Sequence, residues 1–252
     1  TGFFAFGAQE VFGSKPQDEV NSGLVTTDPG IQKIADQALD AALKRHKASL
    51  GFVVVSDPQS GRILAVANKD LVETEAQRTP HWALSLRVGP ASIAKAIVAA
   101  AAVDKGSTSF EEIHNCEKGK YQFGGKTYQD WKPFDRLTTA DTVIQSSNIC
   151  GVKVGQKLGP AGLAQTLKDF GFGPGGSAEK FPESRPGEVP TSVGNDAAYA
   201  AAVSTGYGGI YVSPIELVQA FGAIANGGKL LKAQTGKTAS EPVVVRRVLS
   251  ED

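Results

Sequence analysis

Methionine is absent from all 252 residues of the chain, which begins at Thr1. A complete translation product of this size is seldom free of methionine, so we expect the chain to be an excised or processed piece of something longer. The sequence also lacks a signal-peptide pattern. Its longest uninterrupted apolar stretch, residues 96–103, is far shorter than the roughly 20 residues of a spanning helix. We therefore expect no segment of this chain to cross a bilayer.

Net charge is also missing, because 26 lysines and arginines balance 26 aspartates and glutamates. This balance gives no general attraction to nucleic acid or to a membrane surface, so we expect neither as a partner. Two cysteines occur, Cys116 and Cys150, and they could pair in an oxidising compartment. We favour the simpler interpretation of two unpaired, small apolar side chains. The histidines, His46, His81 and His114, show no metal-ligand spacing, so we expect no metal site.

Hydrophobic residues, by contrast, make up 41% of the chain, which is a normal share for the core of a globular fold. Residues 1–24 show no periodicity and are interpreted as a linker or the end of an upstream region. Helical spacing of apolar residues over 28–48, with Asp28 as the cap, predicts an amphipathic helix. Two β-branched runs around the turn sequence DPQSG predict a β-hairpin over 51–68.

Helix-boundary signals divide the rest of the chain into further elements. The apolar run that follows Ser92 stops at Lys105 and Gly106, and its all-round apolar character predicts a buried helix. The remaining predictions are a capped helix over 137–159 interrupted at Ser146 and Asn148, helices over 159–173 and 213–228, and a strand over 242–249.

One pair at the start of the buried helix could carry chemistry. Ser92 and Lys95 are three residues apart and therefore project from one helix face. A serine hydroxyl is a poor nucleophile near neutral pH, and a buried lysine whose pKa is lowered could take its proton. The first helical turn also offers free backbone N–H groups for a developing oxyanion. Taken alone, the pair is also what a capping serine and a solvent-facing lysine would give.

A second polar group lies in the sequence SSNIC, residues 146–150, where the predicted helix is interrupted. The Ser146 hydroxyl could relay a proton, and the Asn148 amide could hold a substrate carbonyl. A polar interruption or cap of the helix is the alternative interpretation.

Taken together and in this order, SIAK (92–95) and SSN (146–148) resemble motifs of the transpeptidase domain of penicillin-binding proteins, most closely the monofunctional class B kind. The resemblance spans roughly residues 23–250. It implies an α/β fold of the α+β type, with an antiparallel sheet flanked by helices and an all-helical subdomain, and it assigns residues 25–252 to the transpeptidase domain. The similar segments include GLVTTDPGIQKIADQAL, GFVVVSDPQSGRILAVAN, RVGPASIAK, LTTADTVIQSSNICGVKVGQKLG and STGYGGIYVSPIELVQAFGAIANGGKLL.

Two departures from the family pattern matter. The family usually has Pro-Gly before the serine, whereas this chain has Pro90-Ala91, and alanine tolerates a positive φ poorly. The third family motif, K-T-G, is matched only by Lys237 and Thr238 in TGKTAS, which follow the sequence ANGG where the family has a connecting segment. We expect the chain to stop before the true motif and so to be incomplete at its C-terminal strands.

The resemblance implies a serine D,D-transpeptidase that cross-links peptidoglycan stem peptides ending in D-Ala-D-Ala and is acylated by β-lactams. By the family mechanism, Lys95 deprotonates Ser92, Ser146 relays a proton and Asn148 orients the acyl peptide, with no metal or organic cofactor. It also implies a periplasmic or other extracytoplasmic location on the bacterial cytoplasmic membrane. The membrane anchor and cell-wall synthesis partners are expected in the full-length protein.

Two other functions stay open at this point. A class D-like β-lactamase or a D,D-carboxypeptidase would form the same acyl-enzyme and resolve it with water. A non-catalytic scaffold or β-lactam sensor would keep the fold without the turnover.

Overall fold

The structure is a computed structural model that describes residues 11–12, 28–71, 82–179, 181–189, 196–236 and 241–251. The chain divides into two compact units, each assembled from separate stretches of sequence. Unit 1 comprises Thr1–Val88, Gly171–Glu188 and Val212–Val248, and unit 2 comprises Gly89–Phe170, Val189–Tyr211 and Leu249–Asp252. Within the described ranges, no helix is long and apolar enough to cross a membrane.

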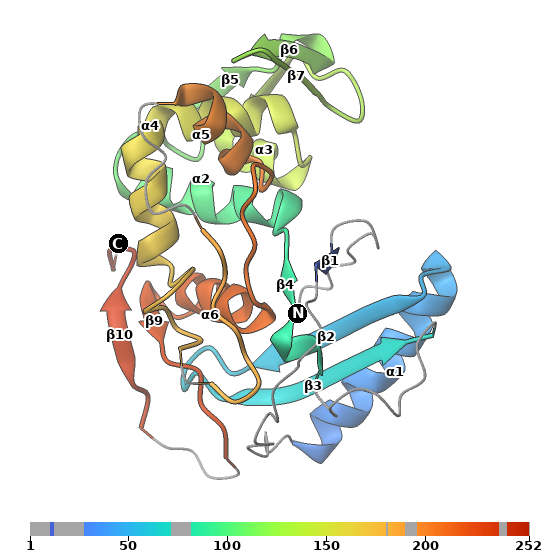
Figure 1. Ribbon diagram of the computed structural model, residues 1–252. Coiled ribbons are helices and arrows are strands. Elements are labelled where there is room, and N and C mark those ends of the chain that lie inside the picture. Colours follow the sequence, from blue (N-terminus) through green and yellow to red (C-terminus); the bar gives the residue numbers. More distant parts are fainter. Residues whose placement is uncertain are drawn as a thin grey trace. The chain divides into compact units, whose positions relative to one another are not determined.

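Unit 1 is built around the predicted β-hairpin, in which β2 (Leu50–Ser56) pairs antiparallel with β3 (Ile63–Asp70). Side chains alternate between the two faces of a strand, and here both faces are apolar and covered. One face packs against α1 (Pro29–His46), which runs along the hairpin in Figure 1, and the other packs against α6 (Pro214–Ala225). The α1 face carries Val53, Val55, Ala65 and Ala67, and the α6 face carries Val54 and Val66.

The helices α1 and α6 begin where the sequence predicts, because their caps are local. The Asp28 carboxylate accepts two backbone N–H groups of the first turn of α1. At α6, Ser213 Oγ accepts the Glu216 N–H at 3.2 Å while the Glu216 carboxylate accepts the Ser213 N–H at 2.8 Å, which is a complete capping box. Glu216 is fully buried and also accepts the N–H groups of Gly173 and Gly187, so this carboxylate ties two loops to the cap.

The other strands of unit 1 are short. The predicted C-terminal strand is confirmed as β10 (Val244–Arg247), which pairs antiparallel with β9 (Lys229–Leu231). A two-residue strand, β1 (Val11–Phe12), pairs with β4 (Arg87–Val88), which follows a 3-10 turn over Trp82–Ser85. The rest of the predicted linker over 1–24 lies outside the described residues.

Unit 2 consists mainly of helices (Figure 1), but it is not the all-helical subdomain that the resemblance implied, because it also contains short strands. A 3-10 turn over Ala91–Ile93 leads into α2 (Ala94–Asp104), which is buried around most of its circumference. The helix predicted over 137–159 is split as expected, into α3 (Thr139–Ile144) and the first part of α4 (Asn148–Asp169). The second part of α4 follows a break at Gly159, where φ is 68°, and corresponds to the helix predicted over 159–173.

The helix α5 (Ala197–Ser204) was not among the sequence predictions, and it packs closely on α4. The contact depends on Gly155, since a Cβ atom placed there would lie 2.2 Å from the Ser204 Cβ. The small residue therefore sets how near the two helix backbones can approach.

Unit 2 also carries short strands that the sequence did not predict. The strand β5 (Ile113–Asn115) pairs antiparallel with β8 (Arg136–Thr138), and β6 (Lys120–Phe123) pairs with β7 (Lys126–Gln129) after a 3-10 turn over Glu117–Gly119. The architecture is therefore mixed, and the described strands join two by two in small antiparallel sheets.

Candidate active site

The backbone around Ser92 is fixed by an unusual turn. Ala91 has a φ of 48°, in the left-handed region where alanine is strained, and its N–H donates to the Gly206 carbonyl at 3.2 Å. The position where the family usually has glycine thus keeps the glycine-like conformation with an alanine side chain. A Cβ atom at Gly206 would lie 1.7 Å from the Ala91 carbonyl oxygen, so Gly206 must lack a side chain for the turn to form. Ser92 follows directly, at the start of the helical segment that continues into α2.

Lys95 is buried, with 3% of its surface exposed, and its ammonium nitrogen sits among four oxygen atoms. Nζ lies 3.0 Å from Ser92 Oγ and 2.7 Å from Asn148 Oδ1. It also lies 2.9 Å from the Ser146 carbonyl and 3.2 Å from Ser146 Oγ. The structure therefore brings together all four residues that the sequence singled out.

Burial lowers the pKa of Lys95 from 10.5 to about 8, against an opposing attraction from the Asp130 carboxylate. With that pKa, about a tenth of the lysine is neutral at pH 7. A neutral amine 3.0 Å from Ser92 Oγ is in reach to accept the hydroxyl proton.

Ser146 and Asn148 reach this point because the chain changes direction between α3 and α4. Ser146 has a φ of 54°, which is uncommon for a non-glycine residue and turns its side chain and carbonyl toward Lys95. Ser147 then caps α4, its Oγ accepting the Cys150 N–H at 3.0 Å. The polar interruption predicted in the helix is thus a break that presents two side chains to one lysine.

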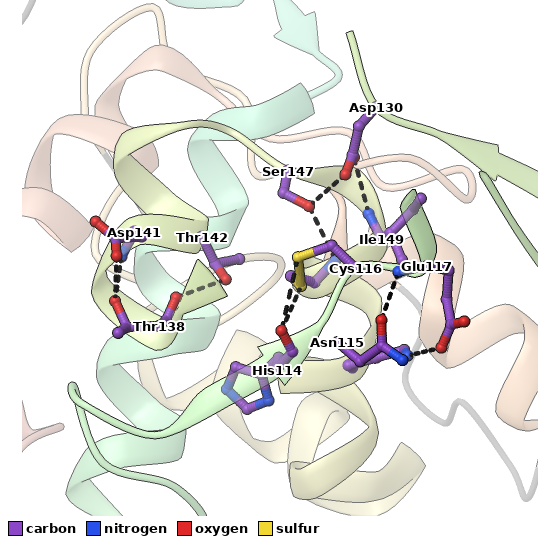
Figure 2. Close-up of a disulfide and its surroundings, with 12 residues drawn as sticks. His114, Asn115, Cys116, Glu117, Asp130, Thr138, Asp141, Thr142, Ser147 and Ile149 are labelled. Carbon is purple, nitrogen blue, oxygen red and sulfur yellow. Dashed lines mark hydrogen bonds and ion pairs between the residues drawn. A yellow bond between two sulfur atoms is a disulfide. The ribbon is translucent and has the colours of Figure 1, made fainter. Parts of the chain in front are cut away.

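Sequence reasoning missed two residues that hold this segment, Gln129 and Asp130. The Gln129 carbonyl accepts the Asn148 side-chain N–H at 2.9 Å, and the Asp130 carboxylate accepts the Asn148 backbone N–H at 2.6 Å. Asp130 also accepts the Ser147 hydroxyl at 2.7 Å, as drawn in Figure 2. The sequence around Asp130 gives no signal of these contacts, because its partners lie 17–19 residues further along the chain.

The structure corrects the expectation for the cysteines, which form a disulfide between Cys116 and Cys150 (Figure 2). The two residues are 34 positions apart, so the pairing could not be read from spacing. They meet because the first turn of α4 packs against the segment that follows β5, where both side chains are fully buried beside the His114 carbonyl. The bridge lies two residues beyond Asn148 and so anchors the start of α4.

The possible third motif, Lys237 and Thr238, lies outside the described residues, which omit 237–240.

Proteins that transfer acyl groups through a serine share this arrangement, in which a serine at a helix start lies beside a buried lysine and a second serine with an asparagine. The chain belongs to the family described as "Penicillin binding protein transpeptidase domain", whose model matches residues 51–252.

Individual relatives agree with this assignment. The chain is 30% identical over 238 residues to the probable peptidoglycan D,D-transpeptidase PbpC of Pseudomonas aeruginosa, with 89% of the chain and 42% of that protein covered. It is 27% identical over 229 residues to the probable peptidoglycan D,D-transpeptidase PenA of Neisseria meningitidis, with 87% of the chain and 38% of that protein covered. The chain thus spans about two fifths of the length of these curated relatives.

A solved structure is similar over nearly the whole chain. The transpeptidase domain of penicillin-binding protein 3 from Burkholderia pseudomallei superposes with a TM-score of 0.78 at 26% identity, covering 92% of this chain and 67% of that one. The fold is therefore that of a penicillin-binding protein transpeptidase domain.

Proposed function

We propose that this chain acts as a serine D,D-transpeptidase domain that cross-links peptidoglycan stem peptides ending in D-Ala-D-Ala. The observation that carries the proposal is the 3.0 Å contact between Lys95 Nζ and Ser92 Oγ, made by a buried lysine whose pKa is lowered to about 8. Family membership and the names of the relatives support the substrate class.

In the first step, neutral Lys95 takes the proton of Ser92 Oγ as the oxygen attacks the carbonyl carbon of the penultimate D-Ala. The tetrahedral intermediate collapses when the peptide C–N bond breaks. The departing D-Ala amine receives a proton through Ser146 Oγ, which lies 3.2 Å from Lys95 Nζ. The product is a peptidyl ester on Ser92 and free D-Ala.

In the second step, an amine from a neighbouring stem peptide attacks the ester carbonyl and gives its proton back to the Ser146–Lys95 pair. The Ser92 oxygen leaves with a proton, so the enzyme is regenerated and an amide cross-link is formed. The Asn148 side chain orients the acyl peptide, since its amide is fixed by Lys95 on one side and by the Gln129 carbonyl on the other. β-Lactams would acylate Ser92 by the same first step, with the ring amide bond opening in place of the peptide bond.

The domain assignment and the location belong to the same proposal. Residues 25–252 form the transpeptidase domain, with an antiparallel sheet flanked by helices and a helical subdomain, and residues 1–24 belong to an upstream segment. The buried Cys116–Cys150 disulfide supports an oxidising, extracytoplasmic compartment, because such bridges are rare in proteins of the reducing cytosol. The membrane anchor and the cell-wall synthesis partners are assigned to the full-length protein.

The test is a reaction of the full-length protein with a stem pentapeptide ending in D-Ala-D-Ala together with an acceptor amine, followed by chromatography of the products. A transpeptidase yields the cross-linked dimer and one free D-Ala for each dimer. Release of D-Ala without dimer would replace the proposal by a D,D-carboxypeptidase, and steady turnover of nitrocefin would replace it by a β-lactamase. A folded protein that catalyses none of these reactions would be a scaffold or a sensor.

A further inference from the structure

Asp130, the residue directly after strand β7, holds the start of α4 through both carboxylate oxygens. Oδ2 accepts the hydroxyl of Ser147 at 2.7 Å, and Oδ1 accepts the N–H of Ile149 at 3.1 Å (Figure 2). Oδ1 also accepts the N–H of Asn148, at 2.6 Å. Ser147, which Asp130 orients, in turn holds the next residue of the helix, because its Oγ accepts the N–H of Cys150. The first amides of α4, which have no partner within the helix, are thus satisfied by Asp130 and by the serine that Asp130 orients.

Gln129, the residue before Asp130, holds the side chain of Asn148. The Gln129 carbonyl accepts the Asn148 side-chain N–H at 2.9 Å, which leaves Asn148 Oδ1 directed at Lys95 Nζ, 2.7 Å away. Consecutive residues at the end of one strand therefore hold the backbone of Asn148 and set the orientation of its side chain.

Accepting the two backbone amides does not require a charged residue, because asparagine caps helices about as well as aspartate; only the Ser147 hydroxyl contact needs the second oxygen. The charge acts on Lys95, whose burial disfavours the ammonium form, and the attraction of Asp130 opposes that effect. Three charged groups on the helices packed against α2 are directed to other partners. Asp141 on α3 accepts the Thr138 hydroxyl, Lys153 on α4 pairs with Glu117, and Lys157 on α4 pairs with Glu112.

We propose that Asp130 is a positioning residue of the Ser92 site, which holds the Ser146–Asn148 segment against Lys95 and supplies the fixed negative charge that stabilises the lysine when it gains a proton. This role in catalysis rests on the proposed function, because the Asp130 charge matters when the proton of Ser92 Oγ moves to Lys95 Nζ. Asp130 acts through Ser147, Asn148 and its electrostatic field at Lys95, and not by direct contact with Ser92 or the reacting carbonyl.

The direct test is a pH titration of Lys95 by NMR of the side-chain Cε, with the resonance assigned by its loss in Lys95→Arg. The wild-type midpoint is expected near pH 8. Asp130→Asn keeps an oxygen that can accept the amides but removes the charge, so the midpoint is expected at lower pH. Asp130→Glu keeps the charge, and its midpoint is expected to stay closer to that of the wild type.

Asp196→Asn is the matched control, because the Asp196 carboxylate also caps a helix of unit 2 by accepting two amides, at the start of α5. It is expected to leave the Lys95 midpoint unchanged. Helix content by circular dichroism checks that each variant is folded. If Asp130→Asn does not fold, Asp130→Ser provides a second neutral side chain that can accept the amides. An unchanged Lys95 midpoint in a folded neutral variant would overturn the inference.

The rate of acylation by benzylpenicillin gives a second readout of the same inference. In Asp130→Asn the rising limb of the rate against pH is expected to move to lower pH together with the NMR midpoint, whereas a merely structural loss would lower the rate at every pH without moving the limb. If wild-type protein forms no adduct on Ser92, the proposed function fails, while the NMR midpoint still decides the charge effect of Asp130.

Discussion

Lys95 Nζ and Ser92 Oγ lie 3.0 Å apart, although the lysine side chain is almost fully buried and comes from an apolar helix. A lysine in such a place costs free energy unless its environment compensates it. Here the compensation comes from two serines and an asparagine, with one carboxylate behind them.

Replacing Lys95 by methionine should lower the rate of Ser92 acylation by benzylpenicillin about 100-fold or more, because a general base contributes on that scale. Methionine keeps an unbranched apolar side chain in the buried space, so the protein should stay folded. Lys105→Met, at the end of the same helix, is the control and should acylate at the wild-type rate. Equal rates in the two variants would show that Lys95 is not the base.

The rate of acylation should rise with pH and reach half of its plateau near pH 8. Lys95 must be neutral to accept the serine proton, and its pKa is lowered to about 8 by burial, so the fraction of competent enzyme grows as pH rises through that value. Stopped-flow quenching of a fluorescent penicillin between pH 6 and 10 measures the profile. A profile that falls across this range would contradict a neutral-lysine base.

Gly206→Ala should lower the acylation rate about 100-fold, since its Cβ would lie 1.7 Å from the Ala91 carbonyl and displace the residue before Ser92. Gly209→Ala is a close control. Gly209 also has a positive φ, 75°, yet a Cβ there would meet no atom within 4 Å. The two variants share the backbone strain and differ in the clash, so similar rates would show that the Ala91 turn does not position Ser92.

Gly155→Ala should lower the free energy of unfolding by about 1–3 kcal/mol, because the added methyl group overpacks the contact between α4 and α5. Gly162→Ala in the same helix meets only the side chain of Leu158, at 3.5 Å, and should stabilise the protein by up to about 1 kcal/mol through helix propensity. Urea unfolding of both variants measures the difference. Equal free energies would mean that the two helices do not approach each other at Gly155.

Replacing both Cys116 and Cys150 by alanine should lower the free energy of unfolding by about 2–4 kcal/mol, because the bridge closes a loop of 34 residues in the unfolded chain. Thermal unfolding of the oxidised wild type and of the double variant measures this difference. A thiol assay, with reduced and unfolded wild type as its reference, checks that the oxidised wild type contains no free thiols. A change well below 1 kcal/mol would count against a disulfide in the native protein.

The helix and hairpin boundaries could be predicted because their causes are local. Asp28 before Pro29 and the Ser213–Glu216 box satisfy amides within three residues of themselves, so the sequence alone contains both partners. The break at Gly159 is of the same kind, since a positive φ suits glycine at that point. The pairing of Lys95 with Ser92 is also local, as they lie one helical turn apart.

The rest depends on contacts between distant segments. The strands β5 to β8 are three or four residues long and carry no alternating pattern strong enough to stand out. Asp130 and the Cys116–Cys150 bridge act across 17–19 and 34 positions, so nothing near them in sequence marks them. Ala91 shows the reverse case, because its side chain argues against the left-handed turn that the surrounding contacts nevertheless impose.

Intact-mass analysis of the full-length protein after reaction with benzylpenicillin, with peptide mapping of the modified residue, tests the central claim most directly. We expect one covalent penicilloyl group for each chain, located on Ser92, and no adduct in Ser92→Ala. An adduct on another residue, or an unmodified Ser92 in protein that is folded by circular dichroism, would contradict it.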